Sequence, residues 1–589
     1  MSGAASFFAE LKRRNVLRAA AFYAASAWLL VQVATQVFPF FHFAEWVVRW
    51  IVMAAVIGFP FAMLFSWFYE WTPQGIQRES EVAPDASIGH QTGKKLDRWI
   101  IAVLSLAVVM LLADKFVLHK DASAVIDKSI AVLPLVNESG DPNNAYFSDG
   151  LSEELIAALA QIGELKVIGR SSSFRFKGGH QDSKTIGEKL GVGTLLEGTV
   201  RKQGEHVRIV AELINAADGR ELWSQTYDRE LKDVFAVQSE IAQAVAGALK
   251  VRLLGGAAEA RQESSTKSAE AHNAYLQGHF YLERHNGESY PKAISFFDEA
   301  IRLDPGYALA YADRAEAWSW VSDQTGNHTA SEIAAARNAA RSDAEKAIAI
   351  NPMLAEAHAA LGWVRYFVDW NFAGALAELR RADQLAPRSA NIKYLLSNVL
   401  FYMGQIQEAS AQIREAVELD PLVFSARDKL AQVLTAEGRL DEAEAQGRKA
   451  AELQPSASGS HRRQVIGAVL RNDGDTALRE AELEPSSGLG LFELALARYA
   501  HSDHAAADAA LAELIAKYRD FMAYQIAEVY AYRGETDSAF ASLQRAYDTH
   551  DAGTLGMLID PLLRGLHSDP RFNKLLVRLG LPVPAGSAP

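Results

Sequence analysis

One spacing constrains this chain more than any other feature. Pro352, Pro387, Pro421 and Pro455 follow one another at intervals of 35, 34 and 34 residues. Proline cannot continue a helix, so its return at a fixed interval marks the end of a repeated unit. A unit of this length buries too little surface to fold alone, and its copies stack to share one core. The spacing therefore predicts a solenoid.

A second pattern returns with the same period. It is a glycine, an alanine five residues later and another alanine seven residues after that, at Gly404, Ala409 and Ala416, at Gly438, Ala443 and Ala450, and at Gly534, Ala539 and Ala546. Small side chains at these points let the two helices of a hairpin, and the next repeat, approach closely. Period and pattern are those of tetratricopeptide (TPR) repeats. They predict an all-α TPR solenoid over residues 269–583, after a linker at 255–268.

Three parts of the array depart from the regular pattern. An earlier repeat ends at Pro305, and the long interval to Pro352 predicts an insertion near 322–331. The degenerate stretch 461–485 predicts a shortened repeat. The tail 559–581 resembles the C-terminal capping segment of bacterial TPR proteins, whose helix seals the last apolar face.

Residues 121–254 have the pattern of a small α/β domain with antiparallel strand pairs. The expected elements are a strand at 129–135, a helix at 147–162 with Ser148 or Asp149 as its N-cap, a strand at 165–169, and a hairpin of 194–200 with 207–214. The segments IAVLPLVNESGDPNNAYFSDGLSEELIAALAQIGELKVIGRSSSFRFKG and LGVGTLLEGTVRKQGEHVRIVAELINAADGRELWSQTYDRE resemble the domain related to the TolB amino-terminal region and the flagellar FlgO protein. The resemblance implies no catalytic role.

Polar residues cluster in this domain around the expected helix and the turn after the second strand. Asp149, Glu153, Glu154 and the turn 170–173 (Arg-Ser-Ser-Ser) have the side chains of an ion or anion site. Helix capping and a polar loop are the alternative, which we favour.

The first 120 residues have the composition of a membrane anchor. Apolar stretches at 19–43, 47–69 and 99–118 predict about three transmembrane helices. A cleaved signal peptide is the alternative for the first stretch. The segments ELKRRNVLRAAAFYAASAWLLVQ and FPFAMLFSWFYEWTPQGIQRES resemble the N-terminal membrane module of many bacterial TPR proteins. The fold expected for the whole chain is therefore multi-domain, with transmembrane helices, a small α/β domain and a TPR solenoid.

The basic residues beside these stretches predict an orientation. They precede the first stretch and lie between the second and third, at Lys12, Arg13, Arg14, Arg18, Arg78, Lys94, Lys95 and Arg98. The positive-inside rule then makes the chain a multi-pass protein of the bacterial inner membrane whose C-terminal region lies in the periplasm. If 99–118 only lies on the membrane surface, that region stays in the cytoplasm.

Composition argues against several classes of function. A formal charge of −13 is unsuited to a general nucleic-acid binder. Without cysteine the chain has no disulfide, thiolate zinc site or thiol nucleophile. A P-loop and an HExxH motif are absent, and the pair His501 and His504 is expected at a solvated helix end. Related proteins join these modules to a class III adenylate cyclase, but the three regions above account for the chain. We predict no enzymatic activity, cofactor or metal.

The expected function is that of a membrane-anchored scaffold or adaptor that binds a protein or peptide partner through TPR grooves. Two alternatives stay open: a regulatory sensor that transmits a periplasmic signal across the membrane, and an adenylate-cyclase-related signalling protein that lacks the catalytic domain. Self-association is also left open.

The first helix of each TPR lines the concave side, which predicts where the partner binds. In repeats that start at Ala355 and Ala390, positions on that face carry the following aromatic or amide side chains: Trp363, Tyr366, Asn391, Tyr394, Asn398 and Phe401. Such side chains suit an extended or helical peptide. Packing between repeats is the alternative for Trp363, Tyr366 and Phe401.

Overall fold

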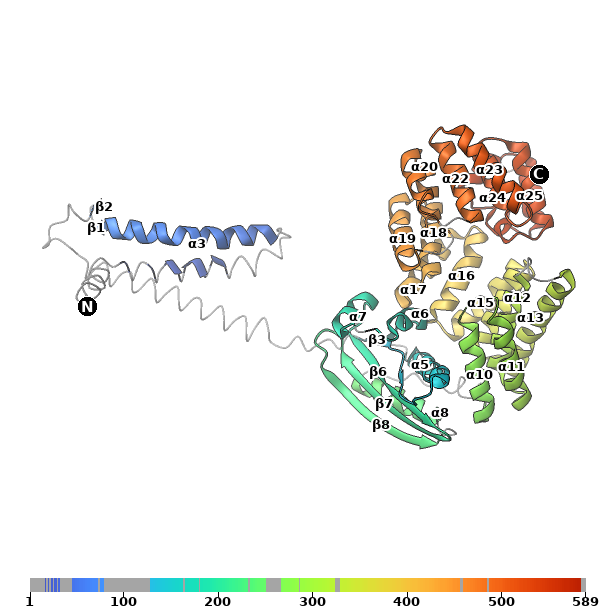
Figure 1. The fold of residues 1–589 in the computed structure, drawn as a ribbon, viewed down its shortest axis with the longest axis horizontal. Helices are drawn as coiled ribbons and strands as arrows, with labels where there is room; N and C mark the ends of the chain where they lie inside the picture. The colour runs from blue at the N-terminus through green and yellow to red at the C-terminus, as the bar shows by residue number, and fades with distance from the viewer. Residues whose placement is uncertain are drawn as a thin grey trace. The chain divides into compact units, whose positions relative to one another are not determined.

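The fold was analysed in a computed structural model, which divides into two compact units, Met1–Val125 and Ile126–Pro589 (Figure 1). The structure describes residues 45–72, 75–78, 128–160, 165–179, 181–230, 234–249, 266–284, 286–323, 329–455, 459–484 and 487–583, with isolated positions between 16 and 31 and at 162.

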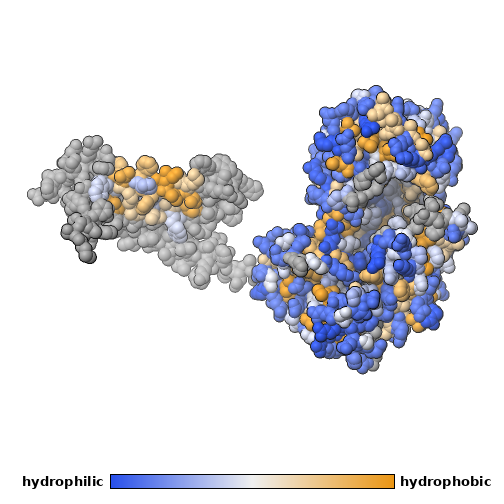
Figure 2. Space-filling view, in the orientation of Figure 1, coloured by the Kyte–Doolittle hydropathy of each residue, from blue (hydrophilic) through white to orange (hydrophobic). Residues whose placement is uncertain are grey.

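The first unit contains helix α3 (Glu45–Phe68) and the antiparallel strands β1 (Tyr69–Thr72) and β2 (Gly75–Arg78). Apolar side chains lie on the surface of α3, including Val56 and Phe61 (Figure 2).

The expected transmembrane helices, and with them the multi-pass inner-membrane location, are not supported. None of the helices among the described residues combines the length and the apolar character of a membrane-spanning segment. The expected span 99–118 and most of 19–43 lie outside the described residues. The expected fold class is therefore corrected to a mostly helical chain with a TPR-like solenoid and a small sheet domain.

The second unit begins with a mixed sheet. Its strands are β3 (Ser129–Val132), β4 (Val136–Asn137), β5 (Lys166–Val167), β6 (Thr194–Gln203), β7 (His206–Asn215) and β8 (Glu221–Glu230). Their order is β5-β3-β6-β7-β8, with β4 beside β6. The pair β6–β7 is the predicted antiparallel hairpin, and β8 adds a second antiparallel pair. The pairs of β3 with β5 and β6, and of β4 with β6, are parallel, which the sequence analysis did not predict.

Helices cover both faces of this sheet. They are α5 (Ala145–Ala160), the short α6 (Arg170–Ser173), α7 (Ser183–Leu190) and α8 (Val234–Ala248). Leu155 of α5 and Ile241 of α8 pack on one face, and Ile186 of α7 packs on the other. Because α5 starts at Ala145, Ser148 and Asp149 lie inside the helix and the predicted N-cap is wrong.

The rest of the second unit is a solenoid of antiparallel helix pairs (Figure 1). Its helices are α10 (Ala269–Leu282), α11 (Tyr290–Leu303), α12 (Ala308–Asp323), α13 (Ala330–Ile350), α14 (Ala355–Trp363), α15 (Phe372–Leu385), α16 (Ala390–Tyr402), α17 (Ile406–Leu419), α18 (Phe424–Ala436), α19 (Leu440–Leu453), α20 (Arg462–Leu470), α21 (Gly474–Ala481), α22 (Gly488–Ala500), α23 (His504–Tyr518), α24 (Ala523–Tyr532) and α25 (Thr536–Asp548). Helices α15, α17 and α19 each end two residues before one of the periodic prolines, as the spacing predicts.

The recurring glycines and alanines have separate roles in each pair. Gly404, Gly438 and Gly534 end the first helices with φ of 75°, 78° and 77°, a left-handed conformation that glycine adopts without strain. The alanines are buried where the second helices pack, with Ala409 fully inaccessible and Ala416 1% exposed. The short α20 and α21 are the predicted shortened repeat.

The chain after α25 closes the array. Two 3₁₀ turns, η8 (Ala552–Gly556) and η9 (Pro561–Leu566), lead into α26 (Pro570–Arg578). Phe572 and Leu576 of α26 are fully buried in a core that also contains residues of α14 to α19. This is the helix that the tail pattern predicts.

Candidate partner-binding surface

A line of aromatic rings runs along the first helices of consecutive hairpins. The ring centroid of Trp320 lies 5.5 Å from that of Trp363 and 6.0 Å from that of Phe367. Tyr366 is 5.7 Å from Trp363 and stacks on Tyr402, with centroids 6.1 Å apart and planes 12° apart. We call these five residues the aromatic ladder. It joins α12, α14 and α16 across three repeats.

The ladder is only partly buried. Trp320, Trp363, Phe367 and Tyr402 are half-buried, and Tyr366 is 7% exposed. Trp363 and Phe367 stack with centroids 4.7 Å apart, where α14 continues into the π-helical turn η7 (Val364–Val368). Such widened turns occur frequently at functional sites. The indole Nε1 of Trp363 is buried and has no hydrogen-bond partner in the described part of the chain.

The six predicted contact residues differ in accessibility. Asn391 is exposed, and Trp363 and Tyr394 are half-buried. Tyr366, Asn398 and Phe401 are buried, with exposed fractions of 7%, 5% and 1%. Asn398 donates from Nδ2 to the carbonyl oxygen of Tyr394 (3.0 Å). The structure thus brings the set onto neighbouring helices but leaves three of its members inside the core; whether the set contacts a partner stays a prediction.

Positive charge lies at the α18 end of the ladder. The ammonium group of Lys429 lies 4.4 Å from the ring centroid of Tyr402 and donates a hydrogen bond to its hydroxyl (3.1 Å). Lys429 is buried, and burial lowers its pKa, as does the charge of Arg463. Cation–π contact and the hydroxyl together offset part of the cost of burying the ammonium.

A buried charged cluster follows in the later repeats. Arg462 pairs with Glu528 (3.3 Å), and Tyr524 donates to Asp560 (2.8 Å). Burial, with the charge of Asp560, raises the pKa of Glu528 well above its usual value. Glu493 is fully buried, and neither of its carboxylate oxygens has a hydrogen-bond partner among the described residues. Burial raises the pKa of Glu493 to about 8, with a smaller contribution from Glu484.

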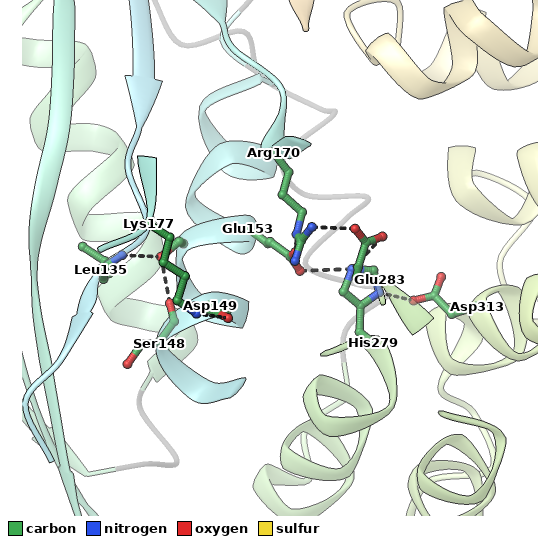
Figure 3. A network of polar contacts seen from close by, with 10 residues as sticks. Leu135, Ser148, Asp149, Glu153, Arg170, Lys177, His279, Glu283 and Asp313 are labelled. Atoms are coloured by element: carbon green, nitrogen blue, oxygen red, sulfur yellow. Dashed lines mark hydrogen bonds and ion pairs between the residues drawn. The ribbon is translucent and has the colours of Figure 1, made fainter. Parts of the chain in front are cut away.

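At the other end of the ladder the sheet domain covers the first repeat through a polar network (Figure 3). Arg170 of α6 pairs with Glu153 of α5 and with Glu283 at the end of α10 (2.5 Å for the latter). His279 of α10 lies between Glu153 (3.0 Å from Nε2) and Asp313 of α12 (2.8 Å from Nδ1). Burial lowers the pKa of His279, but the hydrogen bond and charge of Asp313 outweigh it and raise the pKa.

A second contact joins α6 to a later repeat. The N-cap position of α6 is Gly169, which has no side chain to accept a hydrogen bond. The Asp420 carboxylate from the turn after α17 accepts one instead, from the Ser172 backbone N–H (2.8 Å). A Cβ atom on Gly169 would lie 2.6 Å from Asp420 Cγ, so glycine is required here. Burial raises the pKa of Asp420 to about 6.

The polar residues that the sequence analysis singled out therefore serve mainly to hold the sheet domain against the solenoid. Glu153, Arg170 and Ser172 contact the solenoid, and Asp149 pairs with Lys177 (2.6 Å) within the sheet domain. Because these contacts join segments far apart in the chain, no local pattern could have identified them.

The histidine pair lies at helix ends. His501 follows α22 and pairs with Asp475 (3.1 Å), and His504 is the first residue of α23. Across the described ranges, no group of three or more His, Asp or Glu side chains is placed to hold a metal.

Comparison with known proteins identifies the repeats. A sequence profile of the tetratricopeptide repeat matches residues 390–421, which are α16 and α17. The chain is thus a TPR-repeat protein. A protein of Rhizobium meliloti (strain 1021) named "Putative adenylate cyclase 3" is 39% identical over 184 residues, 31% of this chain. The aligned segment spans 31% of that relative's length.

Solved TPR structures share low sequence identity with this chain. YrrB, described as a TPR protein with an unusual peptide-binding site, is 22% identical, with 36% of this chain and 96% of YrrB covered and a TM-score of 0.26. PilF of Pseudomonas aeruginosa is 19% identical, with 38% of this chain and 99% of PilF covered and a TM-score of 0.29.

Proposed function

We propose that this TPR-repeat protein is a non-catalytic scaffold or adaptor that binds a segment of a protein partner along the aromatic ladder. The half-buried rings of Trp320, Trp363 and Phe367 are the observation that carries the proposal. Large aromatic side chains dominate binding energies because they bury much area at low entropic cost.

Of the six predicted contact residues, the accessible ones are proposed to touch the partner directly. These are Trp363, Tyr394 and Asn391. Tyr366, Asn398 and Phe401 would hold them in place from beneath, because their own side chains are buried.

Selection of peptides from a random library on the purified chain tests this proposal. The selected peptides are then titrated against Trp363→Leu and Tyr394→Ala variants, with thermal unfolding measured in parallel. Each substitution is expected to weaken binding by roughly 1–3 kcal/mol while the fold is retained. Phe521→Ala is the matched control, because Phe521 is 61% exposed and lies between α23 and α24, which contribute no ladder residue. Binders that respond to neither Trp363→Leu nor Tyr394→Ala would contradict the proposal.

The segment shared with the Rhizobium protein favours a second candidate, a signalling role related to adenylate cyclases but without catalysis. Absence of activity is proposed here and is measured directly. The purified chain is incubated with ATP and Mg²⁺ or Mn²⁺, and cyclic AMP is assayed. Turnover above that of a heat-denatured control would make the chain an enzyme.

A further inference from the structure

The carboxylate of Glu316 lies beside the first ring of the ladder. Its Oε1 accepts a hydrogen bond from the Trp320 indole N–H (3.2 Å), one helical turn away on α12. Glu316 is half-buried, and in the part of the chain that the structure describes it forms no ion pair with a basic side chain. Glu316 therefore offers negative charge at the rim of an apolar aromatic surface.

Basic groups at this end of the ladder are already engaged. His279 of α10 contacts Glu153 and Asp313, and Arg170 of α6 contacts Glu153 and Glu283. Burial is the largest cause of a raised Glu316 pKa, about 7. The charges of Asp313 and Glu283 add to it, while the Trp320 hydrogen bond and His279 act in the opposite direction. The negative charge at this end is thus only partly compensated from within the chain.

We infer that the segment bound on the ladder presents a lysine or arginine side chain, which lies over the half-exposed rings of Trp320 and Trp363 and pairs with Glu316. The inference rests on the proposed function and names the chemistry of the partner. A cation over an indole face is attracted by the ring quadrupole, and Trp is the best such ring. Pairing with Glu316 adds charge-assisted hydrogen bonds where solvent is partly excluded.

Charge at the two ends of the ladder gives the segment a direction. Glu316, Asp313 and Glu283 lie at the α12 end, whereas the buried ammonium of Lys429 lies against Tyr402 at the far end. A basic side chain at the Tyr402 end would meet Lys429 and be repelled, because like charges in a poorly solvated site cost more than in water. The basic residue of the segment is therefore assigned to the α12 end. An acidic side chain of the segment would instead be repelled at the α12 end and attracted by Lys429 at the Tyr402 end.

The experiment uses the full chain and short synthetic peptides chosen from the random-library selection. Peptides are compared with copies in which lysine and arginine are replaced by glutamine. The protein variants are Glu316→Gln, Trp320→Leu and the control Glu408→Gln, whose carboxylate pairs with Arg380 on exposed surface of the second helices. Selected peptides should be rich in basic residues. Glu316→Gln should weaken their binding about tenfold, whereas Glu408→Gln should leave their affinity unchanged. Neutralising the peptide should have a smaller effect in the Glu316→Gln variant than in the native chain, because only the cation–π contact is then left to lose.

The pH dependence of peptide affinity separates direct pairing with Glu316 from a merely structural role, because a structural role would not change that dependence. If only the ionised carboxylate binds, lowering the pH from 8 to 6 reduces affinity roughly tenfold in the native chain. The effect should vanish in Glu316→Gln. Binders that depend on Trp363 and Tyr394 but are neither basic nor sensitive to Glu316→Gln would overturn this inference and leave the proposed function standing. Binders insensitive to every ladder substitution would overturn both.

Discussion

The indole ring of Trp370 and the imidazole ring of His550 stack face to face, with centroids 3.6 Å apart and planes 6° apart. Trp370 follows the π-helical turn after α14, and His550 follows α25. Both residues have positive φ, 54° and 59°. The contact therefore joins the third repeat to the segment after the last one, and it is consistent with the shared core of α14–α19 and α24–α26.

Trp370→Ala should lower the free energy of unfolding by roughly 1–3 kcal/mol, because it removes this stack and the edge contact with Tyr547. Urea denaturation measures the loss. A double-mutant cycle with His550→Ala should give a coupling of about 0.5–1.5 kcal/mol. Zero coupling would mean that the rings are neighbours without mutual stabilisation.

Asp420→Ala should loosen the docking of the sheet domain. The substitution leaves the Ser172 N–H without its acceptor, which costs roughly 1–2 kcal/mol. Hydrogen exchange should quicken at Ser172 and at Leu422, whose N–H donates to the Ser172 hydroxyl (2.7 Å). Asp420→Asn keeps an acceptor oxygen and removes a buried charge, so its loss should be smaller. Equal protection of Ser172 in all three proteins would argue against this cap.

Two glycines in first helices predict opposite responses to alanine. A Cβ atom on Gly362 would lie 2.7 Å from Leu379 Cγ on the packed helix α15, whereas one on Gly467 of α20 meets nothing within 4 Å. Gly362→Ala should therefore destabilise the protein by about 1–3 kcal/mol. Gly467→Ala should stabilise it by roughly 0.5–1 kcal/mol, because alanine loses less backbone entropy in a helix. Thermal unfolding of the two variants, compared with the native chain, measures both effects. A shift of the unfolding midpoint with the same sign in both variants would refute the packing argument.

Stability should fall as the pH rises from about 4 to 8. The pKa values of Asp420, Glu316 and Glu493 are raised to about 6, 7 and 8. At any pH between the ordinary pKa and the raised pKa of such a group, the folded state therefore binds more protons than the unfolded state. The free energy of unfolding then decreases with pH across that window. The raised pKa of His279 acts in the same direction, while the lowered pKa values of His550 and His567 oppose it.

Glu493→Gln isolates one part of this dependence. Glu493 is fully buried, and its raised pKa should account for on the order of 2 kcal/mol of the stability lost between pH 6 and pH 8. Urea unfolding of the native and variant chains at both pH values measures the difference. The variant should lose that much less, and parallel losses in the two chains would show that Glu493 does not titrate in this range.

Local patterns in the sequence predicted the repeats well, because each depends on residues close in the chain. Pro421 ends the repeat after α17, and Gly404 takes the left-handed turn that follows α16. The hairpin β6–β7 was likewise readable from alternation around Gly204. Strand β8 was missed because most of its residues are exposed, so neither face has an apolar pattern. Its single buried residue is Tyr227.

Contacts between distant segments could not be predicted from such patterns. The burial of Phe401 depends on helices several repeats away, and the contact of Asp420 with Ser172 depends on how the sheet domain docks. The membrane expectation failed because hydropathy alone was taken to define spans that the described helices do not form. The aromatic ladder was found only in part, since Trp320 lies outside the repeats used for the prediction.

Leu276 belongs to the repeats by its place in the chain and to the sheet by its packing. It is 3% exposed within the core formed by α5, α8 and the sheet, and a Cβ atom on Gly150 would lie 2.6 Å from it. A gene fusion that joined this sheet to a foreign array would leave a leucine-sized hole in that core, at a cost of roughly 2–5 kcal/mol. The sheet domain therefore needs α10, the first helix of the array, to complete its own core.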